Sequence, residues 1–118
     1  MNEARIRGLM GLSVRAGQAA FGEDGCLTRV RSGRCGALLV DGGASKRTRE
    51  KYEGACLHAN VPMLLLPEGL LEQATGRPGM AMAIAPGGLA EQLLRLADED
   101  GLTTQPMKSA NNCGGASV

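Results

Sequence analysis

The chain has 118 residues, of which 43% are hydrophobic and 21% are charged, so a wholly disordered or collagen-like protein is excluded and one domain with its own core is favoured. Phe21 and Tyr52 are the only aromatic residues, which excludes a surface that stacks nucleotide bases on several rings. No apolar stretch approaches the ~20 residues of a membrane-spanning helix, and charges interrupt the first residues where a signal peptide is apolar. We therefore expect a cytoplasmic protein with no membrane partner.

The net charge is only +1, but the charges are distributed unevenly. Residues 1–51 contain ten Lys and Arg against five Asp and Glu, whereas residues 52–118 contain three against seven. A locally positive face of this kind can attract phosphates, although charge runs are also typical of solvated helix surfaces.

Apolar spacing predicts alternating helices and strands along the chain. Helical periodicity covers residues 3–15, a short strand covers 18–21, and the turn at 22–25 leads into a helix that ends at Gly33. A buried strand at 37–40 and a turn at 41–45 precede a helix that Ser45 caps and whose apolar stripe runs to Ala59. The remaining predicted elements are a strand at 61–66, a helix at 70–75, a strand at 80–85 and a last helix containing Leu89, Leu93, Leu96 and Ala97.

This alternation predicts an α/β fold, a sandwich of helices on both sides of a largely buried sheet of about four short strands. The apolar period stops after residue 97, and residues 98–118 are charged and then rich in Ser, Asn and Gly. We therefore expect a single domain at 1–97 and a flexible C-terminal tail at 98–118.

The residues that catalysis or metal binding would need do not combine into a site. The four cysteines include no C-x-x-C pair, and His58, two positions after Cys56, points to a different helix face. The segment 41–46 has the outline of a phosphate loop but lacks its spacing, so a strand-to-helix turn is favoured. We expect no enzyme, no metal, no cofactor and no small-molecule substrate.

Two helix starts are candidates for phosphate contact. Gly22 and Gly25 would let backbone approach a ligand at the start of the second helix, and the arginines that follow, Arg29, Arg31 and Arg34, could straddle phosphates. At the start of the third helix, four basic residues oppose the helix dipole unless an anion lies close: Lys46, Arg47, Arg49 and Lys51. A solvated turn and polar helix faces are the alternative interpretation of both segments.

Four stretches of sequence occur together in one order. They are 11–17 (GLSVRAG), then Gly22-Glu23 with Leu27 and 30–33 (VRSG), then 37–44 with 48–51, Cys56 and 60–62, and finally 74–76 with 81–85. In this order they resemble the kink-turn RNA-binding ribosomal-protein superfamily of the L-seven-Ae type and, within it, the bacterial YlxQ-like proteins. The resemblance covers about residues 5 to 97.

The resemblance implies a three-layer α-β-α sandwich with a mixed sheet, and a protein that binds structured RNA, associated with the ribosome or its assembly, without a cofactor. In the family, the start of the second helix enters the major-groove side of a kinked RNA, and the loop after the third strand gives apolar support. Together with the basic residues, this gives the RNA-binding candidates Arg15, Gly22, Glu23, Asp24, Gly25, Thr28, Arg29, Arg31, Arg34, Lys46, Arg47, Leu66 and Pro67.

The sequence departs from the family at three of these positions. The family's Asn, Glu and Lys correspond here to Asp24, Gly25 and Thr28, while its glycine is kept at Gly22. The alternative hypothesis is therefore a protein-interaction module on the same fold that has lost kink-turn specificity.

Overall fold

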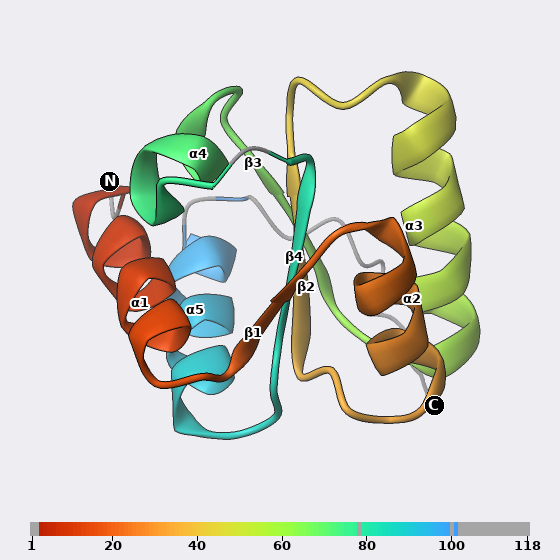
Figure 1. Ribbon diagram of the computed structural model, residues 1–118, viewed down its shortest axis with the longest axis horizontal. Coiled ribbons are helices and arrows are strands. Elements are labelled where there is room, and N and C mark those ends of the chain that lie inside the picture. Colours follow the sequence, from red (N-terminus) through yellow and green to blue (C-terminus); the bar gives the residue numbers. More distant parts are fainter. Residues whose placement is uncertain (1–2, 78, 100, 102–118) are drawn as a thin grey trace.

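The computed structural model describes residues 3–77, 79–99 and 101 (Figure 1). It confirms the predicted alternation of five helices and four strands. Among the described residues, none of the helices combines the length and the apolar character needed to cross a membrane. The elements are α1 (Glu3–Arg15), β1 (Ala19–Phe21), α2 (Glu23–Arg31), β2 (Ala37–Asp41), α3 (Lys46–Ala59), β3 (Met63–Leu66), α4 (Leu70–Thr75), β4 (Ala81–Ile84) and α5 (Gly88–Glu99).

The four strands form one mixed sheet in the order β1-β4-β2-β3. β2 and β3 are parallel, with Leu38 opposite Met63, because α3 returns the chain to the same end of the sheet. β4 is antiparallel to both β1 and β2, so it begins where the other three strands end. β3 lies at one edge of the sheet, and Pro62 and Pro67 stand directly before and after it.

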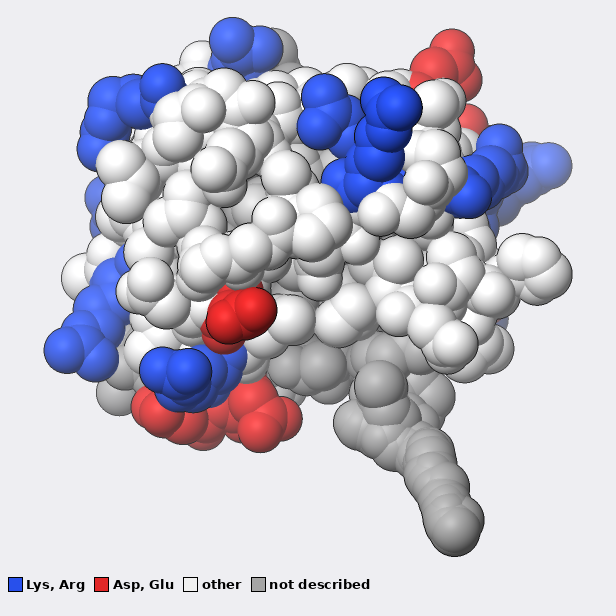
Figure 2. Space-filling model, turned by 90° about the horizontal axis from the view of Figure 1, so that it is seen from below, with Lys and Arg blue, Asp and Glu red and all other residues white. Residues whose placement is uncertain are grey.

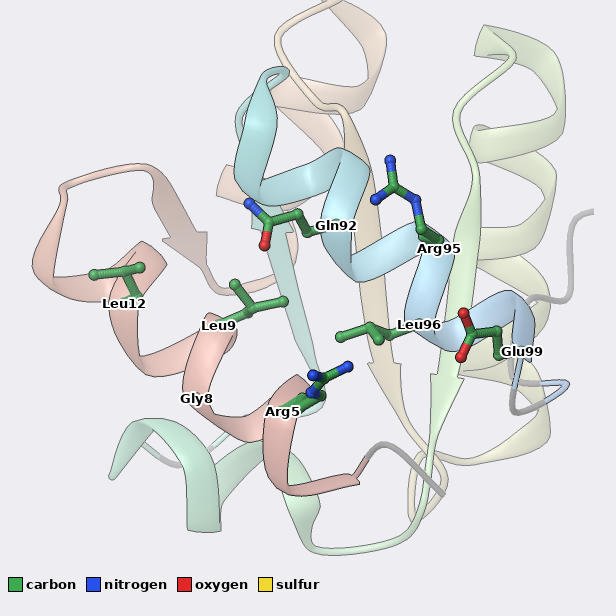
Figure 3. Close-up of a pocket in the computed structure, with 8 residues that line it drawn as sticks. All are labelled: Arg5, Gly8, Leu9, Leu12, Gln92, Arg95, Leu96 and Glu99. Carbon is green, nitrogen blue, oxygen red and sulfur yellow. The ribbon is translucent and has the colours of Figure 1, made fainter.

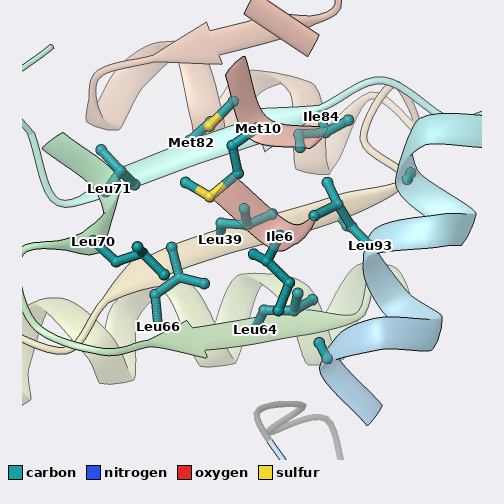
Figure 4. Close-up of a cluster of buried hydrophobic side chains, with 13 residues drawn as sticks. Ile6, Met10, Leu39, Leu64, Leu66, Leu70, Leu71, Met82, Ile84 and Leu93 are labelled. Atoms are coloured by element: carbon teal, nitrogen blue, oxygen red, sulfur yellow. The ribbon is translucent and has the colours of Figure 1, made fainter. Parts of the chain in front are cut away.

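Helices cover both faces of the sheet, as the resemblance implied. α1, α4 and α5 pack on one face, over a core of long aliphatic side chains (Figures 1 and 4). We call this core the aliphatic cluster, and its larger members include Ile6, Met10, Leu39, Leu64, Leu66, Leu71, Met82, Ile84 and Leu93. α2 and α3 pack on the other face, over what we call the thiol cluster, which includes Cys26, Val30, Cys35, Leu38, Val40, Tyr52, Cys56 and Met63.

Two boundaries differ from the sequence-based prediction. α2 begins at Glu23 rather than after Gly25, because Gly22 has φ 85° and ψ 152°, a conformation that residues with a Cβ avoid, and the helix follows directly. The acidic first turn then suits the helix dipole. At the other end of the chain, α5 continues to Glu99, two residues into the predicted tail, and the rest of that tail lies outside the described residues except Gly101.

The two ends of the sheet carry different loops. At the end drawn uppermost in Figure 1, which we call the upper end, β1, β2 and β3 lead into α2, α3 and α4, and the chain enters β4 from α4. The lower end carries the turns from α1 to β1, α2 to β2, α3 to β3 and β4 to α5. This division decides which of the candidate residues can act together.

Candidate functional site

The start of α2 is an open helix terminus at the upper end of the sheet. The first helical hydrogen bond runs from the Cys26 N–H to the Gly22 carbonyl at 3.0 Å, and no side chain of the described chain caps the terminus. Gly22, Glu23 and Asp24 are all exposed. Free N–H groups and the helix dipole favour an anion at such a terminus, whereas the two carboxylates beside it reduce that attraction.

A lysine from α3 offsets one of these carboxylates. The Lys51 Nζ lies 2.7 Å from the Glu23 Oε2, and both side chains are about half exposed. The pair joins α2 to α3 and places a cation beside the start of α2. The sequence indicated Lys51 as one of the basic residues near the start of α3, but not its place beside Glu23, because the two are 28 residues apart and only the packing of α2 on α3 brings them together.

Arg77 is a second basic residue at this terminus that the sequence did not indicate. Its guanidinium carbon lies 4.9 Å from the centre of the Phe21 ring, within the range of a cation–π contact. Phe21 directly precedes Gly22, so the contact holds the charge of Arg77 next to the start of α2. The Arg77 N–H also donates to the Thr75 Oγ1 at 3.2 Å, which fixes the backbone where α4 ends.

Met80 is an exposed apolar residue that the pairing of β1 with β4 places near this terminus. Phe21 pairs with Met82, so Met80, two residues earlier on an antiparallel strand, lies just past the end of β1. Its side chain is 46% exposed, and its carbonyl accepts from the Asp41 N–H at 2.8 Å.

Leu66 and Pro67 do not lie where the sequence-based interpretation needs them. Leu66 is the last residue of β3 and Pro67 follows it, and β4 and β2 separate this strand from β1 by about 14 Å at the usual spacing of strands. Leu66 is also only 2% exposed and belongs to the aliphatic cluster. The strand order instead places the loop between α4 and β4 beside the end of β1, next to Gly22.

The arginines expected around the start of α2 lie elsewhere. Arg29 and Arg31 occupy its last turn, and Arg34 follows in the loop to β2, so all three are at the lower end. Nine helical residues separate the two ends of α2 by about 13 Å. Arg15, at the end of α1, is also at the lower end, and Thr28 is exposed part-way along α2. Seen from below, basic side chains form separate groups around the rim, with uncharged surface between them (Figure 2).

Lys46 and Arg47 do share the upper end with the start of α2. Both are exposed in the first turn of α3, where the Ser45 side chain accepts from the Thr48 N–H at 3.2 Å, as the sequence predicted. The Lys46 Nζ lies 4.0 Å from the Glu50 Oε2, a long contact between two mostly exposed side chains. The charge of Lys46 therefore remains accessible to solvent. Lys46, Arg47 and Lys51 on α3 and Arg77 after α4 thus all lie at the upper end.

A buried carboxylate fixes the loops behind this surface. Asp41, 3% exposed at the end of β2, accepts hydrogen bonds from the N–H groups of Gly43 at 2.8 Å, Gly69 at 3.0 Å and Leu71 at 3.3 Å. A Cβ on Gly42 would stand 2.7 Å from the Leu66 carbonyl oxygen, so the two loops approach too closely for a side chain. The turn at 41–45 is therefore a strand-to-helix turn joined to the loop after β3.

The three described cysteines are buried and have weakly acidic thiols. Burial raises the pKa of Cys26 to about 11 and that of Cys56 to about 12, and it also raises the pKa of Cys35. Thiols of this kind remain protonated near neutral pH and are poor nucleophiles. Within the described part of the chain, no group of three or more His, Cys, Asp or Glu could hold a metal ion. Cys113 lies outside the described residues.

Comparisons with known proteins find similarity both in sequence and in structure. No family model matches the chain. It is similar to a curated protein named for RNA binding. That protein, "RNA-binding protein YlxQ" of Enterococcus faecium, is 26% identical over 98 residues, which are 82% of this chain and 95% of the relative.

The solved structures agree on the fold. A protein of unknown function from Bacillus halodurans matches with a TM-score of 0.76 at 24% identity, covering 80% of this chain and 98% of that one. The "15.5kD RNA binding protein" of Giardia lamblia matches with a TM-score of 0.68 at 14% identity, covering 84% and 90%. The mixed α-β-α sandwich is therefore a fold that this chain shares with an RNA-binding protein.

Proposed function

We propose that this chain binds RNA through the upper end of its sheet. The similarity to YlxQ, which extends over nearly the whole of that relative, carries the proposed function. The geometry supports the location, because an uncapped helix terminus, a cation held on Phe21 and the exposed Met80 occur together there. The surface that we propose consists of Gly22, Lys46, Arg47, Lys51, Arg77 and Met80.

Each part of this surface has a distinct chemical role toward RNA. The N–H groups at the start of α2 donate to phosphate oxygens, and Lys51 keeps the Glu23 carboxylate neutralised at that point. Arg77 is held on the Phe21 ring and so loses less side-chain freedom on binding a phosphate or stacking on a base. Met80 offers an apolar contact to a base that is turned out of the helix.

We propose a structured RNA as the ligand, with a kinked helix of ribosomal RNA as the finer hypothesis. An exposed helix terminus with one apolar side chain beside it fits a bent or bulged RNA better than a single strand, because the chain has only two aromatic residues and so no series of rings for stacking. Asp24, exposed at the same terminus, is unfavourable to phosphate and is the observation that favours the alternative, a protein-interaction module.

The test compares binding to a kink-turn RNA with binding to a straight duplex of the same composition, by fluorescence anisotropy. We expect Arg77→Ala to weaken binding about tenfold, which corresponds to a contact of ~1.4 kcal/mol. The matched control is Arg31→Ala at the lower end, which we expect to change affinity less than about twofold. With about four phosphates neutralised, log affinity should fall against log salt with a slope of roughly −3 to −4.

Three outcomes would change this proposal. Equal affinity for both RNAs would remove the kinked ligand but keep RNA binding. A larger loss with Arg31→Ala than with Arg77→Ala would move the site to the lower end. Absence of RNA binding at low salt, together with partners that persist after nuclease treatment, would favour the protein-interaction module.

A further inference from the structure

Two surface hollows differ in the sign of the charges that line them. The groove between α1 and α5 carries both signs, because Arg5, Arg95 and Glu99 all line it (Figure 3). A second hollow, with an open volume of about 510 Å³, lies between the last turns of α2 and α3 at the lower end of the sheet. We call it the lower hollow, and its lining consists of Val30, Arg31, Gly33, His58 and Ala59. Within the described chain, this lining includes a guanidinium and an imidazole but no carboxylate.

The turn that follows α2 presents two arginines beside the lower hollow. Gly33 ends the helix with φ 77°, a left-handed conformation typical of such a position. The Arg34 N–H then donates to the Arg29 carbonyl at 2.9 Å, so backbone contacts fix the turn. Arg31 and Arg34, before and after Gly33, are exposed, and within the described residues no ion pair holds either guanidinium. Both charges are therefore available to a ligand.

The acidic residues of the elements around the lower hollow lie away from it. Both acidic residues of α2 stand in its first turn, about 13 Å from its end. Glu53, the nearest on α3, is five residues before His58 and so lies on another side of that helix. Glu91 stands in the first turn of α5, at the lower end, but α5 covers the opposite face of the sheet. The lower-end turns at 60–62 and 85–87 contain no charged residue.

The ends of the two helices reduce this positive charge but do not cancel it. α2 and α3 both end at the lower end, and a helix C-terminus carries about half a negative charge. The last turn of α2 carries Arg29 as well as Arg31, and Arg34 follows, so three guanidinium charges outweigh the two helix ends. The exposed His58 imidazole adds a hydrogen-bond donor. The lower hollow therefore favours an anion.

An RNA backbone fits the lower hollow better than a small anion. Arg31, Arg34 and His58 are exposed, so no buried cation encloses a single phosphate. Cations spread over an open surface suit successive phosphates of a polyanion. Between its first turn and Arg29, α2 carries no basic residue, and Asp24 is exposed near its start. No continuous basic track along α2 therefore joins the lower hollow to the upper end.

We propose that the lower hollow binds the phosphate backbone of a second RNA segment, so that one copy of this chain bridges two RNA segments. This inference rests on the proposed function, because it takes the upper end as the place where the first segment binds. The two contacts open at opposite ends of the sheet, and the phosphates of the second segment contact Arg31, Arg34 and the His58 imidazole.

The test captures a second RNA on the full chain. A kink-turn RNA is immobilised and saturated with the protein, and a fluorescent RNA duplex of unrelated sequence is then added at low salt. We expect the protein to capture the duplex, and the double change Arg31→Ala with Arg34→Ala to weaken capture about tenfold. Because two phosphate contacts are lost, the slope of log capture affinity against log salt should become shallower by about two. The same double change should alter binding of the kink-turn RNA by less than about twofold.

The matched control is Arg5→Ala with Arg95→Ala, which removes the same charge from two exposed positions outside the lower hollow and should leave capture unchanged. Chemical shifts locate the contact without any variant, so the test does not depend on whether a variant folds. In the isotope-labelled full chain saturated with kink-turn RNA, we expect the duplex to move the amide resonances of Arg31, Gly33 and Ala59.

The proposed function and this inference fail in different ways. If no kink-turn RNA binds, the proposed function is wrong and so is the bridge between two segments. If the kink-turn RNA binds but no duplex is captured, or if capture survives Arg31→Ala with Arg34→Ala, the lower hollow is not an RNA contact and the proposed function stands. Shifts at Gly33 that inorganic phosphate causes and the duplex does not would assign the hollow to a small anion instead.

Discussion

The two faces of the sheet are packed with different chemistry. Under α1, α4 and α5, the buried side chains are mostly Leu, Ile and Met, whereas under α2 and α3 three cysteines and several alanines take part. Longer aliphatic side chains bury more apolar surface, so the first face contributes more to the free energy of unfolding per residue. The second face positions α2, the helix with the proposed RNA contact, and its stability depends on thiols that ionise in alkali. The aliphatic face thus contributes more of the stability, whereas the thiol face holds the helix whose start belongs to the proposed RNA surface.

The largest expected effect tests the aliphatic face. Leu93→Ala should lower the free energy of unfolding by about 2–5 kcal/mol, because a fully buried leucine leaves a cavity beside α5. Cys56→Ala, also fully buried but on the thiol face, removes a single sulfur atom and should lower it by about 1 kcal/mol. Urea denaturation monitored by circular dichroism measures both. Equal losses would show that the two faces contribute alike.

The pH dependence tests the thiol face. A thiol whose pKa is raised by folding stays protonated in the folded chain above the pH at which it ionises in the unfolded chain, so its contribution to stability is complete at neutral pH, begins to fall near the unfolded pKa and is lost as pH rises to the folded pKa. Between about pH 7 and pH 9 we expect a loss of about 0.4 kcal/mol for each of Cys26 and Cys56, with a steeper loss above pH 9. Denaturation under reducing conditions at both values measures it.

The matched variant for this experiment is Cys56→Ala, which should show a smaller loss between the two pH values than the unmodified chain. A pH dependence that is unchanged in this variant would mean that Cys56 is not among the groups responsible. Tyr52, whose pKa burial raises to about 12, adds to the loss only in stronger alkali.

Asp41 joins the two faces, and its substitution is the next prediction. Asp41→Asn replaces one accepting oxygen by an amide NH2, so one or more of the N–H groups of Gly43, Gly69 and Leu71 lose a partner. We expect about 1–3 kcal/mol of lost stability and faster hydrogen exchange at the amides of Gly69 and Leu71. Ser32→Ala, which removes an exposed 3.3 Å contact, is the control. Unchanged exchange would mean that the loop after β3 is held by other contacts.

The smallest expected effect concerns Lys51. Lys51→Ala removes a half-exposed ion pair and should change the free energy of unfolding by less than about 1 kcal/mol. Its effect on RNA affinity should be larger than that of Lys46→Ala on the same helix, because it leaves Glu23 unneutralised beside the start of α2. Equal RNA affinities of the two variants would separate Lys51 from the binding surface.

The order and type of the elements could be predicted because they depend on local patterns. Apolar spacing located the five helices and four strands of the described residues, and Ser45 identified the start of α3. The start of α2 was placed too late, since its two glycines were interpreted together as a turn. Of these two glycines, Gly22 has a positive φ in the structure, whereas Gly25 lies within the helix.

The candidate site could be predicted only in part, because it depends on strand order. No local pattern shows that β4 lies between β1 and β2, which is what brings Arg77 and Met80 to Gly22 and keeps Leu66 away from it. The separation of Arg29 and Arg31 from the start of α2 could have been predicted from the sequence, since a rise of about 1.5 Å per residue places them at the far end of the helix. The cation–π contact of Arg77 depends on a loop that approaches Phe21 from a distant part of the sequence.

The prolines beside β3 have a consequence for how this protein behaves at high concentration. β3 is an edge strand of four apolar residues, the kind of segment that recruits further strands and starts aggregation. Pro62 and Pro67 lack the N–H group that would extend such pairing, so any intermolecular ladder is limited to the four residues between them. The two prolines that delimit β3 therefore limit its pairing with strands of other molecules, the step by which a fibril would grow.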